Sequence, residues 1–316
     1  MGIQKIGADT TDSPVAELSG VAKRFGDINA VDGIDLTVGP GEAVAFLGPN
    51  GAGKSTTINL LLGLLRPNSG HVALFGRSPW LPAARRLVGA TPQETDFPPN
   101  LSVAELLGLV AAHFPAPAPI QALLRDFGLD GLTGRHAAKL SGGERRRLAL
   151  AMAFAGNPRA VFLDEPTTGL DVEARQTFWH AVRRYHQGGG AVFLTTHYLE
   201  EAEALADRVV LIDRGRIVQQ GAVAEIKARF AVKRLRFRAA AVPDLPGFAE
   251  ARLVDGRVVV DSPDTDALVR SLIRADIEFD DLEVEPVSLE DAVVSVFRDD
   301  RAAAEQRTDN GETADR

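Results

Sequence analysis

The apolar positions of this chain change their spacing several times between the two ends. Four short apolar runs, at residues 43–47, 160–163, 191–195 and 208–212, are continuous instead of alternating with polar residues. Continuous runs of this length are typical of strands that are buried on both faces of a parallel sheet, and helix-like stretches lie between several of them. The pattern therefore predicts an α/β core.

The flanking segments have other patterns. Residues 15–38 are short β-rich runs broken by turn residues, which predicts antiparallel strands that open the fold. Residues 1–14 have neither the apolar centre of a signal peptide nor dense positive charge, so we interpret them as a mobile leader. Between about residues 94 and 157 the pattern turns helical, with one Pro/Ala-rich break at 114–119, which indicates an inserted helical subdomain.

The C-terminal part forms a separate block. Strand-like runs at 235–238 and 257–260 and a helix-like run at 266–274 predict a small α+β domain over residues 233–297. Its last helix is expected to start near Ser288 with a capping-box-like sequence, and its apolar side chains fall on one face: Leu289, Val293, Val296 and Phe297. Residues 298–316 carry no large apolar side chain, which predicts a disordered tail.

Composition excludes several classes of protein. Of the 316 residues 45% are apolar and 25% charged, so the chain can form a sizeable core. The absence of cysteine excludes disulfides and thiolate chemistry and agrees with the cytoplasm. The net charge of −8 argues against a general nucleic-acid binder. No apolar run approaches the about 18 to 20 residues of a membrane-spanning helix, so we expect none.

A glycine-rich motif lies between the first core strand and a helix-like stretch. It fits G-x-x-x-x-G-K-[ST], the phosphate-binding loop, in the required context of strand, loop and helix. Its glycines let several backbone N–H groups point at phosphates, Lys54 is expected to reach the β and γ phosphates, and Ser55 is expected to hold Mg²⁺. The motif consists of Gly48, Pro49, Asn50, Gly51, Ala52, Gly53, Lys54, Ser55 and Thr56.

Two acidic residues, Asp164 and Glu165, end the apolar run that begins at residue 160. Carboxylates at the carboxyl end of a core strand lie where ligands bind in open α/β sheets. Asp164 is placed to hold Mg²⁺ through water, and Glu165 to act as a general base on the attacking water. The alternative is that both acids only cap a turn before Pro166.

A second anion-binding sequence follows later in the chain. Ser141, Gly142 and Gly143 in the run LSGGE stand before a helix-like stretch, and a helix N-terminus of this kind binds anions. One γ-phosphate does not need two such sites from one subunit, so we predict a head-to-tail dimer with nucleotide at the interface. The arginines at 145–147 are interpreted as a solvated helix start, with nucleic-acid contact as the alternative.

These motifs, followed by Thr195-Thr196-His197, resemble the ATP-binding cassette (ABC) ATPases in order and spacing. LSGGE is the most discriminating motif, because many unrelated ATPases carry only the phosphate loop. The resemblance implies a P-loop NTPase core, a nucleotide-binding domain over residues 15–230, and ATP and Mg²⁺ as ligands.

The resemblance also implies roles by position. Gln93 matches the glutamine that touches Mg²⁺ and the attacking water, and His197 matches the histidine that contacts the γ-phosphate. Asp171 matches the aspartate that signals across the dimer. Phe25 matches the aromatic residue, usually Tyr, that stacks on adenine. Each residue taken alone has another interpretation. His197 could be a polar cap after a strand, Gln93 an ordinary loop amide, and Phe25 a core residue.

A hydrolytic subunit without a membrane span implies separate membrane-spanning partners. The resemblance therefore favours the motor of an exporter, held at the inner face of the cell membrane by two membrane subunits that dock near Gln93 and residues 94–105. The alternative is a soluble ABC-type mechanochemical ATPase acting on ribosomes or DNA. The exporter is favoured because the chain has a single cassette, no heptad repeats, no cysteine and a negative net charge.

The end of the C-terminal block, around Ser288-Leu-Glu-Asp-Ala-Val, resembles the bacterial drug-exporter branch that includes daunorubicin-resistance ATPases. This implies drug-like or other hydrophobic cargo, although a motor subunit has no contact with cargo that would identify it. For residues 233–297 we expect a regulatory or dimer-stabilising role, with a passive appendage as the alternative.

Overall fold

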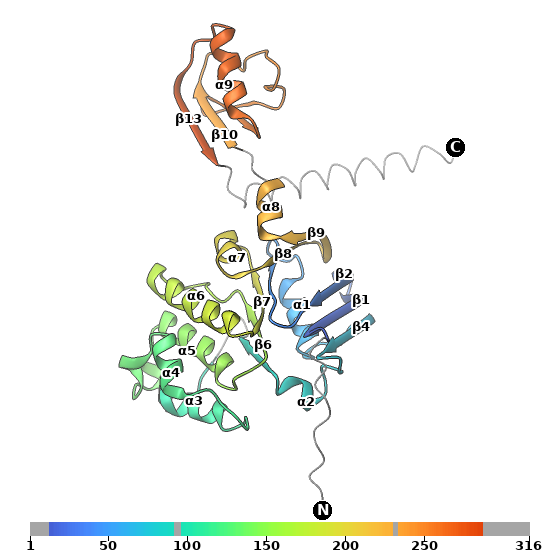
Figure 1. Cartoon of the computed structure of the whole chain (residues 1–316), viewed down its shortest axis with the longest axis vertical. Helices are drawn as coiled ribbons and strands as arrows, with labels where there is room; N and C mark the ends of the chain where they lie inside the picture. Colours follow the sequence, from blue (N-terminus) through green and yellow to red (C-terminus); the bar gives the residue numbers. More distant parts are fainter. Residues whose placement is uncertain (1–12, 92–95, 230–232, 287–316) are drawn as a thin grey trace, which may run out of the picture. The chain divides into compact units, whose positions relative to one another are not determined.

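The computed structural model describes residues 13–91, 96–229 and 233–286 (Figure 1). The chain divides into two units between Val223 and Ala224. The sequence interpretation extends the first domain to residue 230, beyond this division. The predictions for Gln93, for the helix after Ser288 and for the tail concern residues outside the described ranges.

A six-stranded sheet forms the centre of the first unit. Its order is β5-β6-β7-β3-β8-β9, the first five strands are parallel, and β9 joins β8 in antiparallel register. Every residue of β3, β6 and β7 is buried, as their continuous apolar sequences predict. The strands are β3 (Ala43–Leu47), β5 (Val88–Thr91), β6 (Ala160–Asp164), β7 (Ala191–Thr196), β8 (Arg208–Asp213) and β9 (Arg216–Ala222).

An antiparallel sheet of three strands, in the order β2-β1-β4, packs beside it. The strands are β1 (Ala16–Phe25), β2 (Ile28–Val38) and β4 (Ser69–Leu74). One hydrophobic core joins both sheets to α1 (Lys54–Leu61), because Leu36 of β2, Ile58 of α1 and Phe46 of β3 belong to the same buried cluster. The sheets thereby fix the loop that joins β3 to α1.

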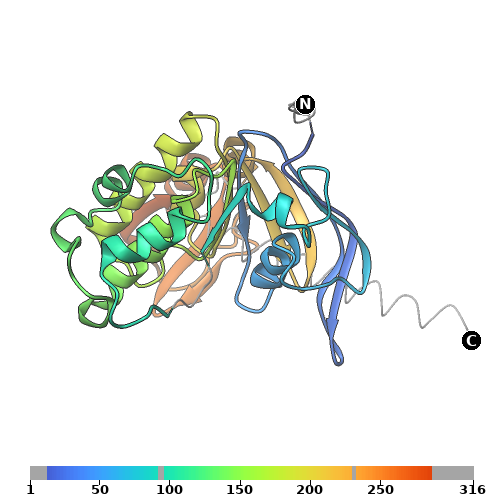
Figure 2. The same cartoon turned by 90° about the horizontal axis from the view of Figure 1, so that it is seen from below.

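Helices α3, α4 and α5 gather on the side of the first unit away from the antiparallel sheet, next to α6, in both views (Figures 1 and 2). A capping box between Ser102 and Glu105 starts α3, and the Pro/Ala-rich break separates α3 from α4. The remaining helices of this unit are α2 (Pro82–Arg85), α3 (Val103–Ala111), α4 (Ile120–Asp126), η1 (Asp130–Leu132), η2 (Ala137–Lys139), α5 (Gly142–Phe154), α6 (Val172–Gln187) and α7 (Leu199–Leu205).

The second unit contains an antiparallel sheet in the order β11-β12-β10-β13. Leu235, Phe237 and Val260 of the sheet form a buried cluster with Leu268 and Leu272 of α9. The elements are α8 (Val223–Arg229), which starts at the boundary, β10 (Lys233–Arg238), β11 (Arg252–Val254), β12 (Arg257–Ser262), α9 (Thr265–Arg274) and β13 (Asp280–Pro286). The predicted fold class, a P-loop NTPase core with antiparallel and helical parts and a small α+β block, is confirmed.

Candidate functional site

The glycine-rich loop between β3 and α1 is shaped by close backbone contacts. A side chain at Gly48 would place its Cβ 2.3 Å from the carbonyl oxygen of Ile212. At Gly53, φ is +107°, and a Cβ would lie 2.2 Å from the carbonyl oxygen of Ala30. Because only glycine fits at both positions, the loop packs directly against the backbone of β8 and β2 just before α1. A glycine-rich turn at a helix N-terminus fits a phosphate group.

Lys54 folds back over this loop. Its side chain is 5% exposed, and Nζ donates hydrogen bonds to the carbonyl oxygens of Gly48 at 2.7 Å and Pro49 at 3.2 Å. The same Nζ lies 3.4 Å from Oε1 of Glu165. A buried ammonium group is stable only with such partners, so its charge is directed at the loop and at the end of β6.

The two acids at the end of β6 have different surroundings. Asp164 is buried, and its Oδ1 accepts a hydrogen bond of 2.5 Å from the hydroxyl of Thr195 on β7. Glu165 has a left-handed backbone conformation, with φ of +44°, and its N–H bonds to the carbonyl oxygen of Thr195 at 3.1 Å. Left-handed residues other than glycine store strain and gather at functional sites, and here the bend turns the Glu165 side chain toward Lys54.

His197 follows β7 and completes this cluster. Its Nδ1 lies 3.4 Å from Oε1 of Glu165, and its ring contacts the ring of Tyr198, with 4.0 Å between the centroids and a tilt of 41°. Lys54 and His197 thus approach the same carboxylate oxygen of Glu165, and the three residues come from separate parts of the fold. This convergence opposes the interpretations of Glu165 as a turn cap and of His197 as an isolated polar cap.

Arg146, near the start of α5, contradicts the prediction that the arginines at 145–147 form a solvated helix start. Its guanidinium donates to the carbonyl oxygens of Asp164 at 2.8 Å, Glu165 at 2.7 Å and Pro166 at 3.1 Å. Burial lowers the pKa of Arg146, and the charges of Asp164, Glu201 and Glu165 oppose that effect. Nothing in a run of three arginines indicates which one turns inward, so this contact could not be predicted from the sequence.

The residues of LSGGE cap α5. The Ser141 hydroxyl accepts from the N–H of Glu144 at 3.3 Å, and the Glu144 carboxylate accepts from the N–H of Ser141 at 2.7 Å. Hydrogen bonding to the Ser141 N–H lowers the pKa of Glu144. Ser141 and Gly142 are exposed, and Gly143 is half-buried. Within the described ranges, Ser141 makes no hydrogen bond to Lys54, Glu165 or His197, so the structure does not bring it to the cluster.

Three further predicted residues have different settings. Asp171 is the N-cap of α6, and its side chain accepts from the N–H of Ala174 at 2.8 Å. Phe25, at the end of β1, is 47% exposed, with Lys23 Nζ 5.1 Å from the centre of its ring. The alternative that Phe25 is a core residue is therefore wrong. Ser55 is half-buried in the first turn of α1, one residue after Lys54.

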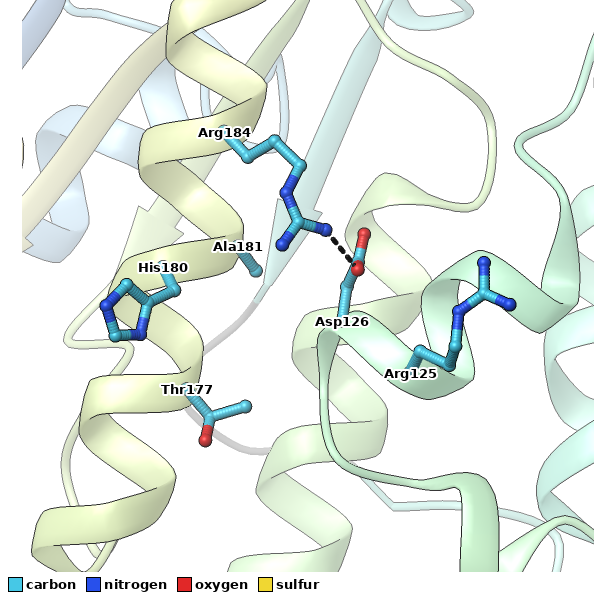
Figure 3. Close-up of a pocket in the computed structure, with 6 residues that line it drawn as sticks. All are labelled: Arg125, Asp126, Thr177, His180, Ala181 and Arg184. Carbon is cyan, nitrogen blue, oxygen red and sulfur yellow. Dashed lines mark hydrogen bonds and ion pairs between the residues drawn. The ribbon is translucent and has the colours of Figure 1, made fainter.

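A pocket elsewhere in the first unit lies between α4 and α6 (Figure 3). An ion pair between Arg184 and Asp126 crosses it. It contains none of the predicted site residues, since its lining consists of Arg125, Asp126, Thr177, His180, Ala181 and Arg184. The described part of the chain has no group of three metal-ligating side chains and no helix long and apolar enough to span a membrane.

Comparison with known proteins places this geometry in a family. Residues 31–168 match the ABC transporter family. Nod factor export ATP-binding protein I of Burkholderia lata is 41% identical over 220 residues, covering 66% of this chain and 72% of that protein. Daunorubicin/doxorubicin resistance ATP-binding protein DrrA of Streptomyces peucetius is 40% identical over 237 residues, covering 73% of this chain and 72% of that protein.

Another relative covers more of the chain. Daunorubicin resistance ATP-binding protein DrrA3 of Streptomyces coeruleorubidus is 36% identical over 308 residues, 91% of this chain and 97% of that protein, so the similarity extends into the second unit. The solved structure of an ATP-binding subunit of an ABC transporter is 28% identical, with a TM-score of 0.63 over 68% of this chain and 93% of that one. The chain therefore belongs to the ABC transporter ATPases and hydrolyses ATP.

Proposed function

We propose that this chain is the motor of an exporter of hydrophobic, drug-like compounds and that Lys54, Glu165 and His197 form its hydrolytic centre. The convergence of these three side chains carries the proposal, because it joins a phosphate-directed cation, a general base and a γ-phosphate contact in one place. Glu165 polarises the attacking water, and Lys54 and His197 contact the β and γ phosphates.

The oxygen ligands at this site fit Mg²⁺, which prefers carboxylate and hydroxyl oxygens shared with phosphates. Asp164 and Ser55 would hold the ion, together with Gln93. When bound, Mg²⁺ neutralises charge on the phosphates. The absence of a three-ligand protein cluster in the described residues is compatible with this, since the nucleotide supplies ligands of its own.

The nucleotide site is completed by a second copy of the chain. Ser141, Gly142 and Gly143 cap α5 at the surface and do not reach the Lys54 cluster of their own subunit. In the proposed head-to-tail dimer, these residues of one copy face the phosphate loop of the other, Asp171 at the start of α6 signals across the interface, and Phe25 stacks on adenine.

A complementation experiment tests the dimer. Lys54→Ala damages the phosphate loop and Ser141→Arg blocks the signature sequence, so each variant alone has no intact site. In a mixed dimer, one site combines the intact loop of the Ser141→Arg chain with the intact signature of the Lys54→Ala chain. Mixing the two inactive variants is therefore expected to restore turnover. If the mixture stays inactive and Glu165→Gln remains monomeric with ATP, the dimer is contradicted.

The proposals for the cargo class and for the membrane partner are based on the relatives. Two of them are named for daunorubicin resistance and one for Nod factor export. We infer that separate membrane-spanning subunits hold the chain at the cytoplasmic face of the membrane. ATP-dependent uptake of a fluorescent anthracycline into inside-out vesicles containing this chain and its co-purifying membrane subunit tests both inferences. A soluble ribosomal partner in place of a membrane subunit would contradict them.

We assign the nucleotide-binding domain to residues 15–230, with a helical subdomain at about 94–157, and a regulatory or dimer-stabilising domain to residues 233–297. The relative that covers 91% of the chain supports a role shared within the branch. Removing residues 233–316 is expected to weaken dimerisation or alter the ATPase rate. If both remain unchanged, these residues are a passive appendage.

A further inference from the structure

The chain bends at Glu165, directly after the end of β6. The backbone φ of Glu165 is +44°, whereas a residue that precedes a proline, here Pro166, ordinarily has an extended backbone with φ of about −120°. A left-handed backbone at a residue other than glycine is strained and persists only where its surroundings hold it. The contacts around Glu165 therefore have to hold this bend against its local preference.

Arg146 on α5 holds the bend through three successive carbonyl groups. Its Nη2 donates to the carbonyl oxygens of Asp164 at 2.8 Å and Glu165 at 2.7 Å, and its Nε donates to that of Pro166 at 3.1 Å. The Glu165 oxygen also accepts a longer bond, of 3.3 Å, from the N–H of Thr168. In an extended strand successive carbonyl groups point in opposite directions, so one guanidinium reaches three of them only where the chain turns. The three bonds thus depend on the bend and stabilise it.

The sheet holds the other side of the same residue. The N–H of Glu165 donates to both the carbonyl oxygen and the hydroxyl of Thr195 on β7, each at 3.1 Å. Thr195 fixes the N–H while Arg146 fixes the carbonyl groups, and together they set the direction in which the Glu165 side chain leaves the backbone. In that direction its Oε1 lies 3.4 Å from Nζ of Lys54 and 3.4 Å from Nδ1 of His197.

We propose that Arg146 is a positioning residue, which holds Glu165 in its bent conformation and so aims the carboxylate at the attacking water. It acts through the main chain, because its guanidinium binds carbonyl oxygens while the carboxylate lies beside Lys54 and His197. Arg146 follows Ser141, the N-cap of α5, by just over one helical turn. It therefore ties the helix that begins at LSGGE to the general base. This inference rests on the proposed role of Glu165.

A glutamine at position 146 removes the forked donor group and keeps one amide donor. With Arg146→Gln in the full chain, kcat for ATP hydrolysis is expected to fall about 10- to 100-fold, because a small misplacement of a catalytic group has an effect of this size. KM for ATP should stay within about twofold, since an interaction that acts only in the transition state lowers kcat and kcat/KM equally. Wild-type kcat, or a loss confined to KM, overturns the proposal.

Arg147→Gln is the matched control. It removes the same charge from the next position of α5, where the Arg147 side chain donates to the carbonyl oxygen of Gly128 at 2.8 Å instead of to the end of β6. Its kcat should equal that of the wild type. If Arg147→Gln lowers kcat as far as Arg146→Gln does, the loss of any arginine from this helix explains the effect, and the positioning role is wrong.

Arg146→Lys separates the shape of the donor group from its charge. Lysine keeps the positive charge but has a single donor nitrogen in place of the planar fork, so kcat is expected to be lower than that of the wild type. Full kcat in Arg146→Lys overturns the proposal, because charge alone then suffices. The melting temperature of each variant shows whether it is folded, and Arg146→Lys provides the test if Arg146→Gln does not fold.

A double variant tests whether Arg146 acts through Glu165. Glu165→Gln removes the base, so the exact direction of this side chain no longer affects the turnover that remains. Adding Arg146→Gln to Glu165→Gln should therefore lower the single-turnover rate no further. If the two effects multiply, Arg146 has a role independent of Glu165 and the proposal is overturned.

Glu165→Gln alone, in the same assay, separates this proposal from the proposed function. If Glu165→Gln keeps full turnover, the proposed function fails and the positioning role fails with it. If Glu165→Gln loses turnover while Arg146→Gln keeps the wild-type kcat, only the positioning role is wrong.

Discussion

Oε1 of Glu165 lies 3.4 Å from the Nζ atom of Lys54, so the proposed general base and the phosphate-directed cation form a buried pair across the loop and the end of β6. The side chain of Glu165 is 13% exposed and that of Lys54 is 5% exposed. Removing either partner from such a pair leaves the other charge uncompensated. Substitutions at the two positions therefore have different expected effects, which depend on whether shape or charge is kept.

Replacing Glu165 with glutamine keeps the shape of the side chain and removes the base. ATP turnover is expected to fall about 10²- to 10⁴-fold, the usual size of a general-base contribution, while ATP binding is retained. Steady-state turnover and equilibrium nucleotide binding of the same preparation check this. Glu173→Gln, at an exposed position of α6, is the control and should keep wild-type turnover. Full activity of Glu165→Gln would remove Glu165 from the base role.

Replacing Lys54 with alanine is expected to weaken ATP binding about 10- to 100-fold, because a hydrogen bond to a charged group is worth about 1.5–3 kcal/mol. The substitution also leaves the Glu165 carboxylate without its nearest cation. Titration with a fluorescent ATP analogue measures the affinity. Lys139→Ala, at an exposed position before LSGGE, should bind like the wild type. Unchanged affinity of Lys54→Ala would mean that Lys54 does not reach the phosphates.

Gly53 is expected to tolerate no side chain. An alanine Cβ would lie 2.2 Å from the carbonyl oxygen of Ala30, and φ of +107° is strained for any other residue. We expect Gly53→Ala to lower the free energy of unfolding by about 2–5 kcal/mol, through strain and overpacking together, and to weaken ATP binding. At Gly131, where a Cβ meets nothing, the same substitution is the control for thermal unfolding. Equal melting temperatures would contradict this account.

Local patterns predicted most of the fold but not the contacts that join elements. The continuous apolar runs predicted β3, β6, β7 and β8, because a strand buried on both faces has apolar residues at successive positions. Strand β13 was not predicted, since its sequence is mostly acidic. Its carboxylates are accommodated by cross-strand ion pairs, such as Arg236 with Glu285 and Arg257 with Glu283.

At the site, too, local motifs were predicted from the sequence, whereas contacts between distant elements were not. The phosphate loop and the acids after β6 are recognisable because their chemistry depends on spacing along the chain. Arg146 and Glu201 were not recognised, because each lies in a run of like charges and only tertiary packing selects the member that turns inward. In α7, Glu200 and Glu203 are exposed while Glu201 is buried. A helix of seven residues has too short an apolar pattern to reveal this difference.

The burial of Glu201 also predicts how stability changes with pH. Its pKa is raised from 4.5 to about 7 in the folded chain, so the folded state binds this proton more tightly than the unfolded state does. The stabilising contribution of the proton is therefore present below pH 4.5 and is lost as pH rises through about 7. For a shift of this size, the loss is about 3 kcal/mol in the free energy of unfolding.

Glu201→Gln removes that titration while keeping the side chain's volume. Its free energy of unfolding, relative to the wild type, is expected to increase by about 2.5 kcal/mol between pH 5 and pH 8, because only the wild type must bury a carboxylate at high pH. Urea unfolding at both pH values, followed by the fluorescence of Trp179 with Trp80 replaced by phenylalanine in all proteins, measures this difference. Glu200→Gln should show no such increase. If the difference between Glu201→Gln and the wild type is the same at both pH values, Glu201 is ionised throughout this range, and burial does not control its protonation.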